Sequence, residues 1–519
     1  MANVTDSASV LVVPSGWSDG VLGSLQPDDG SSDFTFSRGS DLSATRVNEQ
    51  GLIEKGYENL LLQSNNFDTS PWTTSGVLTG NQVGYDGSSD AWLFESPSTF
   101  MQVGQNLSVS GVQTYSVYAK AGTTDWIHIR LLGDSVIYTA FDLNPSTTGN
   151  RIGANVNTVS ASIEDVGGGW FRCSLVANNI TTTARIYIAR DNSTTINVGD
   201  NIYIQDAQLN QGLAAYPYIE TGITTAKNPV ILEDQPRIDY TSGNGVVLIE
   251  PQRTNLISYS EYLTPINGGA VGYNSAVSPE GVQNALKVIF GPTTNDAALM
   301  GLSAPCSGST EYTWSAYVKN VSGTGVFNIR IDTDTQGVLV RQSITATSEW
   351  TRVTHTFTTD ASATSFTSNC RYRSVTDGNE ILIWGAQMEQ GYPTSYIPTY
   401  GTSQTRLKDT ATLTKNVTST GTIYININAQ TSRTLTFLGA DISVTQGVNK
   451  IAMAYSPTAL KVSKNGTIVA NITRAFDTTA LTQIQLGHRN NFEQTTDSIN
   501  QFLTLDSFLN DTKLNELTA

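Results

Sequence analysis

The sequence predicts an all-β protein made of tandem β-sandwich or jelly-roll modules with an extended N-terminal arm. Three observations carry this prediction. Short segments that alternate polar and apolar residues recur along the chain, and Gly, Asn, Asp or Ser bounds each of them. Long amphipathic helical patterns are absent, and the best helical segment is the short stretch 510–517. Two regions of the chain also repeat one another, block by block and in the same order.

The alternating segments are rich in β-branched and aromatic residues, which favour strands. Successive side chains of a strand point to opposite faces, so one face can pack into a core while the other stays polar. The clearest segments are 114–120, 126–132, 185–190, 202–204, 327–331, 422–427 and 461–468. Within the last of them, Asn465-Gly466 predicts a tight hairpin, because a two-residue primed turn needs positive φ. Many short strands joined by turns are typical of sandwiches and jelly rolls.

The internal repeat defines two modules. Four blocks match in the same order: 58–64 with 254–260, 115–120 with 314–319, 170–172 with 350–352, and 202–212 with 381–391. Both copies close with a tyrosine-rich segment, around Tyr216 and Tyr396. We therefore assign the first jelly-roll module to 59–222 and the second to 255–402. Positions that the copies share are expected to define the fold, and positions that differ are better candidates for recognition.

The rest of the chain frames these modules. We assign 1–58 to the N-terminal arm, 223–254 to a connector and 403–519 to a third sandwich. The 519 residues are enough for three or four domains. Hydrophobic residues make up 39% of the chain, which suffices for cores, whereas only 14% are charged. Gly, Ser, Thr and Asn take the place of charges, as in many extracellular β-proteins.

The acidic charge balance restricts the partners. A net charge of −16 repels nucleic acid phosphates and anionic membrane surfaces, so we expect neither partner. No run of about 18 apolar residues is present, so no membrane-spanning segment is predicted. The first residues lack a basic region followed by an apolar core, so no signal peptide is predicted. Three cysteines argue against a disulfide framework; Cys306 and Cys370 could pair, but we expect buried free thiols.

Two segments resemble the framework motifs of bacteriophage head-spike and tail-fibre proteins. Residues 33–54 (DFTFSRGSDLSATRVNEQGLIE) resemble the opening motif, and residues 235–256 (QPRIDYTSGNGVVLIEPQRTNL) resemble the motif that normally follows it directly. Here about 180 residues separate the two, which we interpret as insertion of the first module into an older framework. The paired repeats look like the carbohydrate-binding jelly-roll modules of phage fibres. Residues 403–519 are similar to concanavalin A/laminin-G-like sandwiches.

This resemblance implies a structural protein of the virion surface, made in the cytoplasm of the bacterial host. It implies that the arm binds phage capsid or tail proteins, that the chain forms a homotrimer, and that the modules attach weakly and multivalently to host or environmental glycans. The short arm and the opening motif favour attachment to the head. The alternatives are a tail fibre or receptor-binding protein, a secreted carbohydrate-binding protein, or an accessory module of a depolymerase.

We predict that the chain is not an enzyme. Its three histidines, His128, His355 and His488, fall in different modules, which argues against a histidine-based triad or a histidine-rich metal site within one module. Nucleophile-elbow, Walker and HExxH motifs are absent from the sequence. Carboxylate pairs of the glycosidase kind leave no sequence motif, so they stay open at this stage.

Sugar binding needs an aromatic ring beside amides or carboxylates, because the ring stacks on apolar C–H faces while polar groups hold the hydroxyls. The candidates are Trp72, Trp92, Trp126 and Tyr138 in the first module and Tyr262 and Tyr273 in the second. The strand face that carries Trp126, His128 and Arg130 is expected to be solvated. No cofactor is expected, although the oxygen-rich turn with Asp86 and Asp90 offers ligands for a structural calcium ion.

Overall fold

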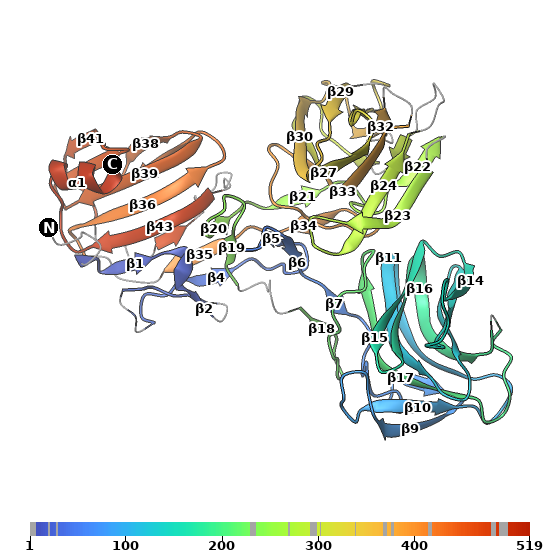
Figure 1. Cartoon of the computed structure of the whole chain (residues 1–519). Coiled ribbons are helices and arrows are strands. Elements are labelled where there is room, and N and C mark those ends of the chain that lie inside the picture. Colours follow the sequence, from blue (N-terminus) through green and yellow to red (C-terminus); the bar gives the residue numbers. More distant parts are fainter. Residues whose placement is uncertain are drawn as a thin grey trace.

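A computed structural model describes residues 7–519 apart from 19–20, 27, 29, 192, 229–234, 268–269, 291–297, 301–302, 338, 367–370, 375–377, 414–417, 479–483 and 487–496. In that part of the chain strands dominate, and the one α-helix is α1 (Asp511–Thr518), where the sequence predicts it. The strands form three β-sandwiches (Figure 1), which confirms the all-β class. Among the described helices, none is long and apolar enough to cross a membrane.

Two strands of 20 residues each, β11 and β16, build the first module. They pair with each other along most of their length, and each passes from one layer of the sandwich into the other. Layer one has the order β14-β13-β12-β16-β11-β8, and layer two has the order β15-β16-β11-β17-β10-β9. The core between the layers takes the inward-facing residues of the predicted strands, such as Ile127 and Ile129. The strands are β8 (Trp72–Thr74), β9 (Val77–Gln82), β10 (Ala91–Glu95), β11 (Gln102–Ala121), β12 (Trp126–Gly133), β13 (Val136–Asp142), β14 (Ile152–Val156), β15 (Ser160–Gly167), β16 (Trp170–Ala189) and β17 (Asn201–Gln211).

The second module follows the same plan with shorter strands. A five-stranded layer, β23-β24-β33-β27-β30, packs against a three-stranded layer, β29-β28-β32, around Trp314 and Phe327. Two short ribbons, β22-β25 and β26-β31, complete the module. The strands are β22 (Thr264–Asn267), β23 (Ala270–Val277), β24 (Gln283–Ile289), β25 (Ala298–Met300), β26 (Ala304–Pro305), β27 (Glu311–Ser322), β28 (Val326–Ile331), β29 (Val340–Thr345), β30 (Thr351–Thr358), β31 (Ser365–Phe366), β32 (Arg371–Ser374) and β33 (Glu380–Gln390).

The shared blocks of the repeat make the same contacts in both modules. Asn59 and its equivalent Asn255 each donate to one carbonyl of the last strand and one carbonyl of the closing segment, at 2.9–3.3 Å. Ser64 and Ser260 each hydrogen-bond the hydroxyl of a tyrosine in the closing segment, at 2.6 Å. The repeated polar residues therefore bind the closing segment of each module to its last strand, β17 in the first module and β33 in the second.

The third sandwich takes strands from three separate parts of the chain. β1 from the N-terminal region and β19 and β20 from the connector join β36, β39, β40, β41 and β43 in one sheet, while β4 joins β35 and β42 in another. The strands are β1 (Val10–Val12), β4 (Thr35–Ser37), β19 (Arg237–Asp239), β20 (Val246–Ile249), β35 (Thr410–Leu413), β36 (Gly421–Ala429), β37 (Arg433–Phe437), β38 (Ala440–Val444), β39 (Gly447–Tyr455), β40 (Ala459–Lys464), β41 (Thr467–Thr473), β42 (Ile484–Leu486) and β43 (Asp497–Leu505). The predicted hairpin at Asn465-Gly466 connects β40 and β41, with φ of 48° and 79°.

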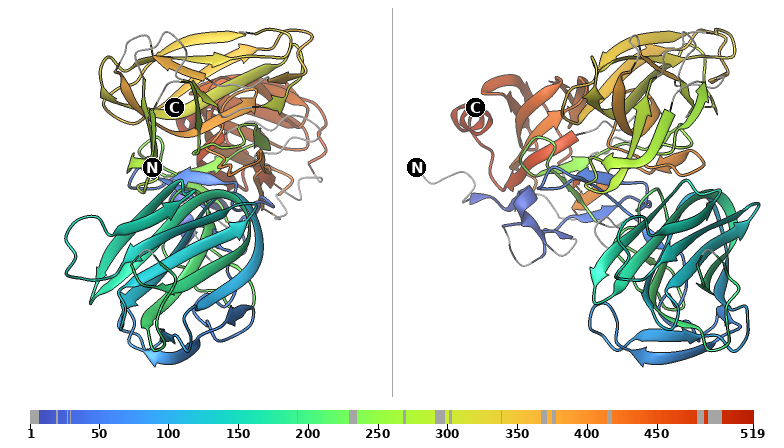
Figure 2. Two further views of the ribbon diagram at one scale, coloured as in Figure 1. Left: turned by 90° about the vertical axis from the view of Figure 1, so that its right-hand side faces the viewer. Right: turned by 45° about the vertical axis from the view of Figure 1, so that its right-hand side comes forward.

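The N-terminal region therefore differs from the extended arm that the sequence predicts. Phe34, Phe36 and Val10 lie in the core of the third sandwich, together with Ile238 and Val247 of the connector. These residues belong to the sandwich because their apolar side chains fill its core, which residues 403–519 do not fill alone. Figures 1 and 2 show the N-terminal strands, in blue, lying against the C-terminal sandwich, in red.

The two framework motifs lie side by side although the first module separates them in sequence. The amide of Tyr240 donates to the carbonyl of Val47 at 3.0 Å, and the amide of Val47 donates to the Asp239 carboxylate at 2.8 Å. Strands β7 (Glu58–Asn59) and β18 (Ala226–Lys227) pair where the chain enters and leaves the first module. The first module thus branches from the framework through one two-stranded ribbon, an arrangement consistent with an insertion.

Five buried charges form a cluster that we call the arginine hub: Arg38, Arg237 and Glu250 of the framework motifs, and Arg406 and Asp409 of residues 403–519. Their side chains are at most 2% exposed. Asp409 pairs with Arg38 at 3.3 Å and also with Arg237, and Glu250 pairs with Arg237 at 2.8 Å and Arg406 at 2.9 Å. Within the part of the chain that the structure describes, the three cations of the hub thus pair with two anions.

The arginine hub connects three parts of the fold. Arg237 lies in the third sandwich, yet it donates to the carbonyl of Thr45 in the opening motif at 3.0 Å. It also donates to the hydroxyl of Ser395, in the closing segment of the second module, at 2.8 Å. Arg406 lies in β34 (Gln404–Arg406), which pairs with β21 (Arg253–Asn255) at the start of that module. The hub therefore fixes the second module to the third sandwich.

A second buried ion group, the Lys55 junction, consists of Lys55, Glu261, Glu280, Tyr216 and Tyr400. Lys55 follows β5 (Thr45–Val47) and ends β6 (Ile53–Lys55) of the framework. Its Nζ lies 2.5 Å from Glu261 and 3.1 Å from Glu280 in the second module, and over the rings of Tyr216 and Tyr400 at 5.3 and 5.5 Å. Burial lowers the pKa of Lys55, but the two carboxylates outweigh it and raise the pKa above its usual value. Because Tyr216 belongs to the first module, the junction holds both repeats to the framework.

Candidate functional site

Two of the predicted sugar-binding tryptophans have structural roles. Trp72 is buried in the core of the first module, and its Nε1 donates to the carbonyl of Gln63 at 2.8 Å. Trp92 packs half-buried against the same core, and its Nε1 donates to the carbonyl of Asn65 at 2.7 Å. Both indoles therefore hold the loop that follows the first repeated block, and their N–H groups are already occupied.

The two tyrosines predicted for the second module lie at its contact with the first. Tyr262 packs against Val112 and Leu213 of the first module, and its ring is stacked with that of Tyr273 at 4.9 Å. The next residue, Asn274, donates to the carbonyl of Leu213 at 2.7 Å. We therefore assign Tyr262 and Tyr273 to the interface between the modules rather than to an open platform.

Trp126 and Tyr138 lie on the outer face of layer one. The ring of Tyr138 is stacked on His128 at 5.5 Å and lies under the guanidinium of Arg130 at 4.9 Å. His128 is only 1% exposed, so the solvated face expected for this strand is instead a packed row of rings and a guanidinium. Burial, with the nearby charge of Arg130, lowers the pKa of His128 to about 4.

The carboxylates of Asp86 and Asp90, where a calcium ion is predicted, are bridged by protein donors. Ser88 donates to Asp86 through its amide at 3.0 Å and its hydroxyl at 2.6 Å, and Gln205 donates to Asp90 at 2.7 Å. Burial raises the pKa of the adjacent Asp206 to about 7, with a contribution from Asp90 and Asp86. Among the described residues, no group of three or more His, Cys, Asp or Glu side chains is arranged to hold a metal ion. Calcium binding stays a prediction.

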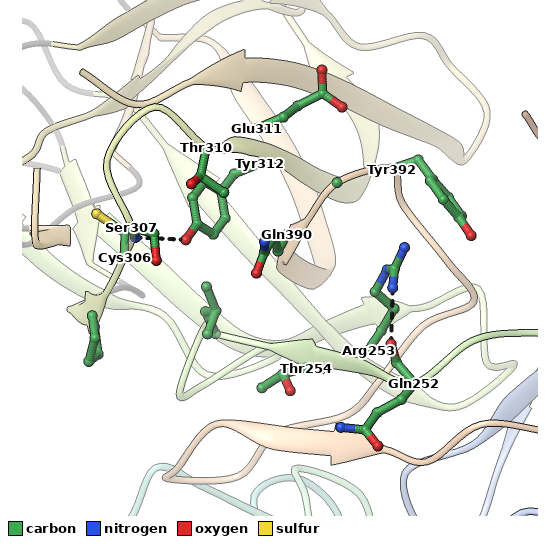
Figure 3. Close-up of a pocket in the computed structure, with 13 residues that line it drawn as sticks. Gln252, Arg253, Thr254, Cys306, Ser307, Thr310, Glu311, Tyr312, Gln390 and Tyr392 are labelled. Atoms are coloured by element: carbon green, nitrogen blue, oxygen red, sulfur yellow. Dashed lines mark hydrogen bonds between the residues drawn. The ribbon is translucent and has the colours of Figure 1, made fainter. Parts of the chain in front are cut away.

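An open groove of about 630 Å³ runs along one edge of the second module, between β21 and the ends of β27 and β33. Figure 3 shows its lining. This volume falls within the roughly 300–1,000 Å³ of small-molecule sites. The polar residues that line it include Gln252, Thr254, Ser307, Thr310, Glu311 and Gln390. The sequence did not single out this groove.

One wall of the groove is a stacked pair, Arg253 and Tyr392. The guanidinium of Arg253 lies 4.7 Å from the centre of the Tyr392 ring, and Figure 3 shows it directed toward that ring. The Nε of Arg253 is buried without a hydrogen-bond partner among the described residues. Cys306 also lines the groove, and burial raises the pKa of its thiol, so the thiol is neutral at neutral pH. Cys370 lies outside the described residues.

The equivalent surface of the first module is covered by the second module. The amide of Gly212 donates to Val112 in the first module as that of Gly391 donates to Glu311 in the second, which makes Val112 the equivalent of Glu311. Leu213 is likewise equivalent to Tyr392. Val112 and Leu213 are at most 1% exposed because tyrosines of the second module pack against them. The copies thus differ in both chemistry and exposure at this edge.

The groove offers an arrangement suited to a hydroxylated ligand. Amides and hydroxyls can donate to and accept from ligand hydroxyls, and the Tyr392 ring offers an apolar wall. Among the described residues that line it, Glu311 is the one carboxylate. Glycoside hydrolysis normally requires a pair of carboxyl groups on either side of the bond that breaks. The arrangement therefore suits the binding of a hydroxylated ligand.

Comparisons with known proteins give the following. No family model matches the chain, and no curated protein matches it. The N-terminal CBM22-1–CBM22-2 tandem domain of Paenibacillus barcinonensis Xyn10C aligns at 11% identity and a TM-score of 0.22, over 68% of this chain and 100% of that domain. Arthrobacter globiformis T6 isomalto-dextranase, complexed with panose, aligns at 12% identity and a TM-score of 0.22, over 64% of this chain and 39% of the enzyme. TM-scores of 0.22 assign neither ligand nor activity to this chain.

Proposed function

We propose that the chain is a non-catalytic attachment protein of a bacteriophage virion surface, which binds host or environmental glycans in the groove of its second module. The groove is the observation that carries the proposal. It is open and polar, with a stacked arginine and tyrosine, at a position where the first copy of the repeat is apolar and covered. A duplicated fold that differs between copies in this way has acquired a separate role at that edge.

The assignment to a phage virion rests on the two framework motifs. Three of their charged residues, Arg38, Arg237 and Glu250, belong to the arginine hub between the second module and the third sandwich. Rigid presentation of a weak site suits multivalent attachment, since linked sites raise the effective concentration. A homotrimer, contact with capsid or tail proteins and attachment to the head are parts of this proposal.

The groove is tested with the purified full-length chain on an array of bacterial surface glycans, followed by titration of the best-bound oligosaccharide. Replacing Tyr392 or Arg253 by alanine is expected to lower the affinity by about tenfold, as loss of a central contact does. Phe476→Ala and Arg474→Ala are the matched controls, because these residues form a similar stacked pair in the third sandwich, at 5.0 Å. Equal affinity of wild type and groove variants would contradict the site, and release of reducing sugar from the glycan would contradict the lack of catalysis.

A further inference from the structure

The outer face of the first module carries two arginines that form no ion pair with the residues that the structure describes. Arg130 on β12 and Arg185 on β16 are direct cross-strand neighbours. Their contacts in the described part of the chain are with His128, Tyr138 and Tyr187, and none of these is an ion pair. Like charges directly opposite each other destabilise a sheet. In a chain of net charge −16, two adjacent cations without a paired carboxylate among the described residues form a candidate site for an anion.

Aromatic rings hold both guanidiniums in position. Arg130 lies 4.9 Å from the ring centre of Tyr138 and 4.4 Å from that of Tyr187. Arg185 donates from Nη1 to the Tyr187 hydroxyl at 3.3 Å. A guanidinium that is already oriented loses less conformational entropy when it binds a ligand. The face is therefore organised for recognition before any ligand arrives.

Polar atoms on this face also lack partners. His128 Nε2, Arg130 Nε and Gln102 Oε1 are buried without a hydrogen-bond partner among the described residues. Gln102 is paired with Tyr187 across the strands, and Tyr187 with His128, so these residues form one row. Buried polar groups without partners cost free energy, which a polar ligand recovers if it reaches them. Their presence on the same face as the two arginines is a second observation that points to a ligand.

The second module shows how such an arginine is neutralised within the protein. Arg330 lies in the middle of β28 between the core residues Ile329 and Ile331, as Arg130 lies between core residues of β12. Asp332, two residues further along the same strand face, pairs with Arg330 at 2.7 Å. The residue at this spacing from Arg130 is Leu132, which has no charge. The first module therefore lacks an internal carboxylate that the second module has.

We propose that this face of the first module binds a carboxylated polysaccharide. The planar guanidinium forks of Arg130 and Arg185 match the geometry of a carboxylate. The rings of Tyr138 and of Phe100, which is 49% exposed and meets Tyr187 edge-on at 5.5 Å, take the apolar C–H faces of the sugar rings. This site lies on a different module from the groove and does not depend on it.

The test measures binding of the full-length chain to polygalacturonate, alginate and hyaluronate, and to carboxyl-reduced forms of each. Wild type is expected to bind at least one carboxylated polymer and to lose about tenfold or more in affinity for its reduced form. Arg130→Gln with Arg185→Gln is expected to cause a similar loss. Leu132→Asp keeps both arginines but supplies the internal carboxylate, and it is expected to weaken binding in the same direction. Thermal unfolding of each variant checks that it is folded.

Two control variants separate this site from other effects. Arg341→Gln and Arg474→Gln remove exposed arginines of the second module and of the third sandwich; both are expected to bind the carboxylated polymer as wild type does. The proposal is overturned if no carboxylated polymer binds, if the reduced polymers bind equally well, or if the double arginine variant keeps full affinity. Tighter binding to single-stranded DNA than to any of the polymers would also overturn it.

Discussion

Replacing Asp409 by asparagine is expected to lower the free energy of unfolding by about 3–5 kcal/mol. The substitution keeps the shape of the side chain but removes one of the two carboxylates of the hub, the one that pairs with Arg38 and Arg237, from a site that is almost fully buried. Burying an unpaired charge is far more costly than losing an exposed ion pair. The second module and the third sandwich both depend on this site, so both are expected to unfold at lower urea concentration.

The urea midpoint of each variant measures this effect. The matched control is Asp511→Asn, because Asp511 is half exposed in its pair with Lys461 and its loss is expected to cost less than about 1 kcal/mol. Adding Arg237→Met to Asp409→Asn returns the excess of cations over anions in the hub from two to one, as in wild type, and is expected to recover part of the loss. An unchanged midpoint for Asp409→Asn would show that the arginine hub does not hold the modules together.

The arginine hub also predicts an acid transition. Burial raises the pKa of Glu250, but Arg406 and Arg237 outweigh it and hold the pKa at about 2, below its usual 4.5. A carboxyl whose folded pKa is lowered contributes stability above its unfolded pKa and loses that stability as the pH falls toward the folded pKa. The wild-type urea midpoint is therefore expected to fall between pH 4.5 and pH 2.

Replacing Lys55 by methionine is expected to weaken the contact between the two repeats by about 3–5 kcal/mol in free energy. Methionine fills much of the same volume but leaves Glu261 and Glu280 buried beside each other without a cation. Burial already raises the pKa of Glu280 although Lys55 lowers it, so loss of Lys55 is expected to raise this pKa further. The first module is then expected to move relative to the second.

Small-angle scattering of wild type and Lys55→Met follows this change, and limited proteolysis in the ribbon between β7 and β18 gives an independent readout. Lys461→Met is the control, because Lys461 belongs to an exposed pair. Adding Glu261→Gln and Glu280→Gln to Lys55→Met removes both unpaired charges and is expected to restore the compact profile. A compact, protease-resistant Lys55→Met variant would show that packing alone joins the repeats.

Local patterns in the sequence were sufficient to predict the strands, the hairpin at Asn465-Gly466, the C-terminal helix and the duplication. Each depends on residues close together in the chain or on one segment matched against another. Strands β1 and β4, which contain Val10 and Phe36 and belong to the third sandwich, could not be predicted in this way. They are short and isolated, and their partners lie hundreds of residues away.

The candidate sites show the same limit. Trp126 and Tyr138 were predicted, but not the pairing of Arg130 with Arg185, because the register between β12 and β16 is a property of the fold. The groove could have been found from the sequence. Alignment of the matched blocks makes Val112 of the first copy equivalent to Glu311 of the second. Positions that differ between the copies in this way were already expected to be the better candidates for recognition.

Localisation on purified phage particles tests the central proposal, attachment at the virion surface, most directly. Antibody against the second module is used to label particles for electron microscopy, and cryo-electron microscopy then places the chain. The result we expect is label on the heads of intact particles, with the groove of the second module facing outward. Absence of the chain from purified particles would contradict the account.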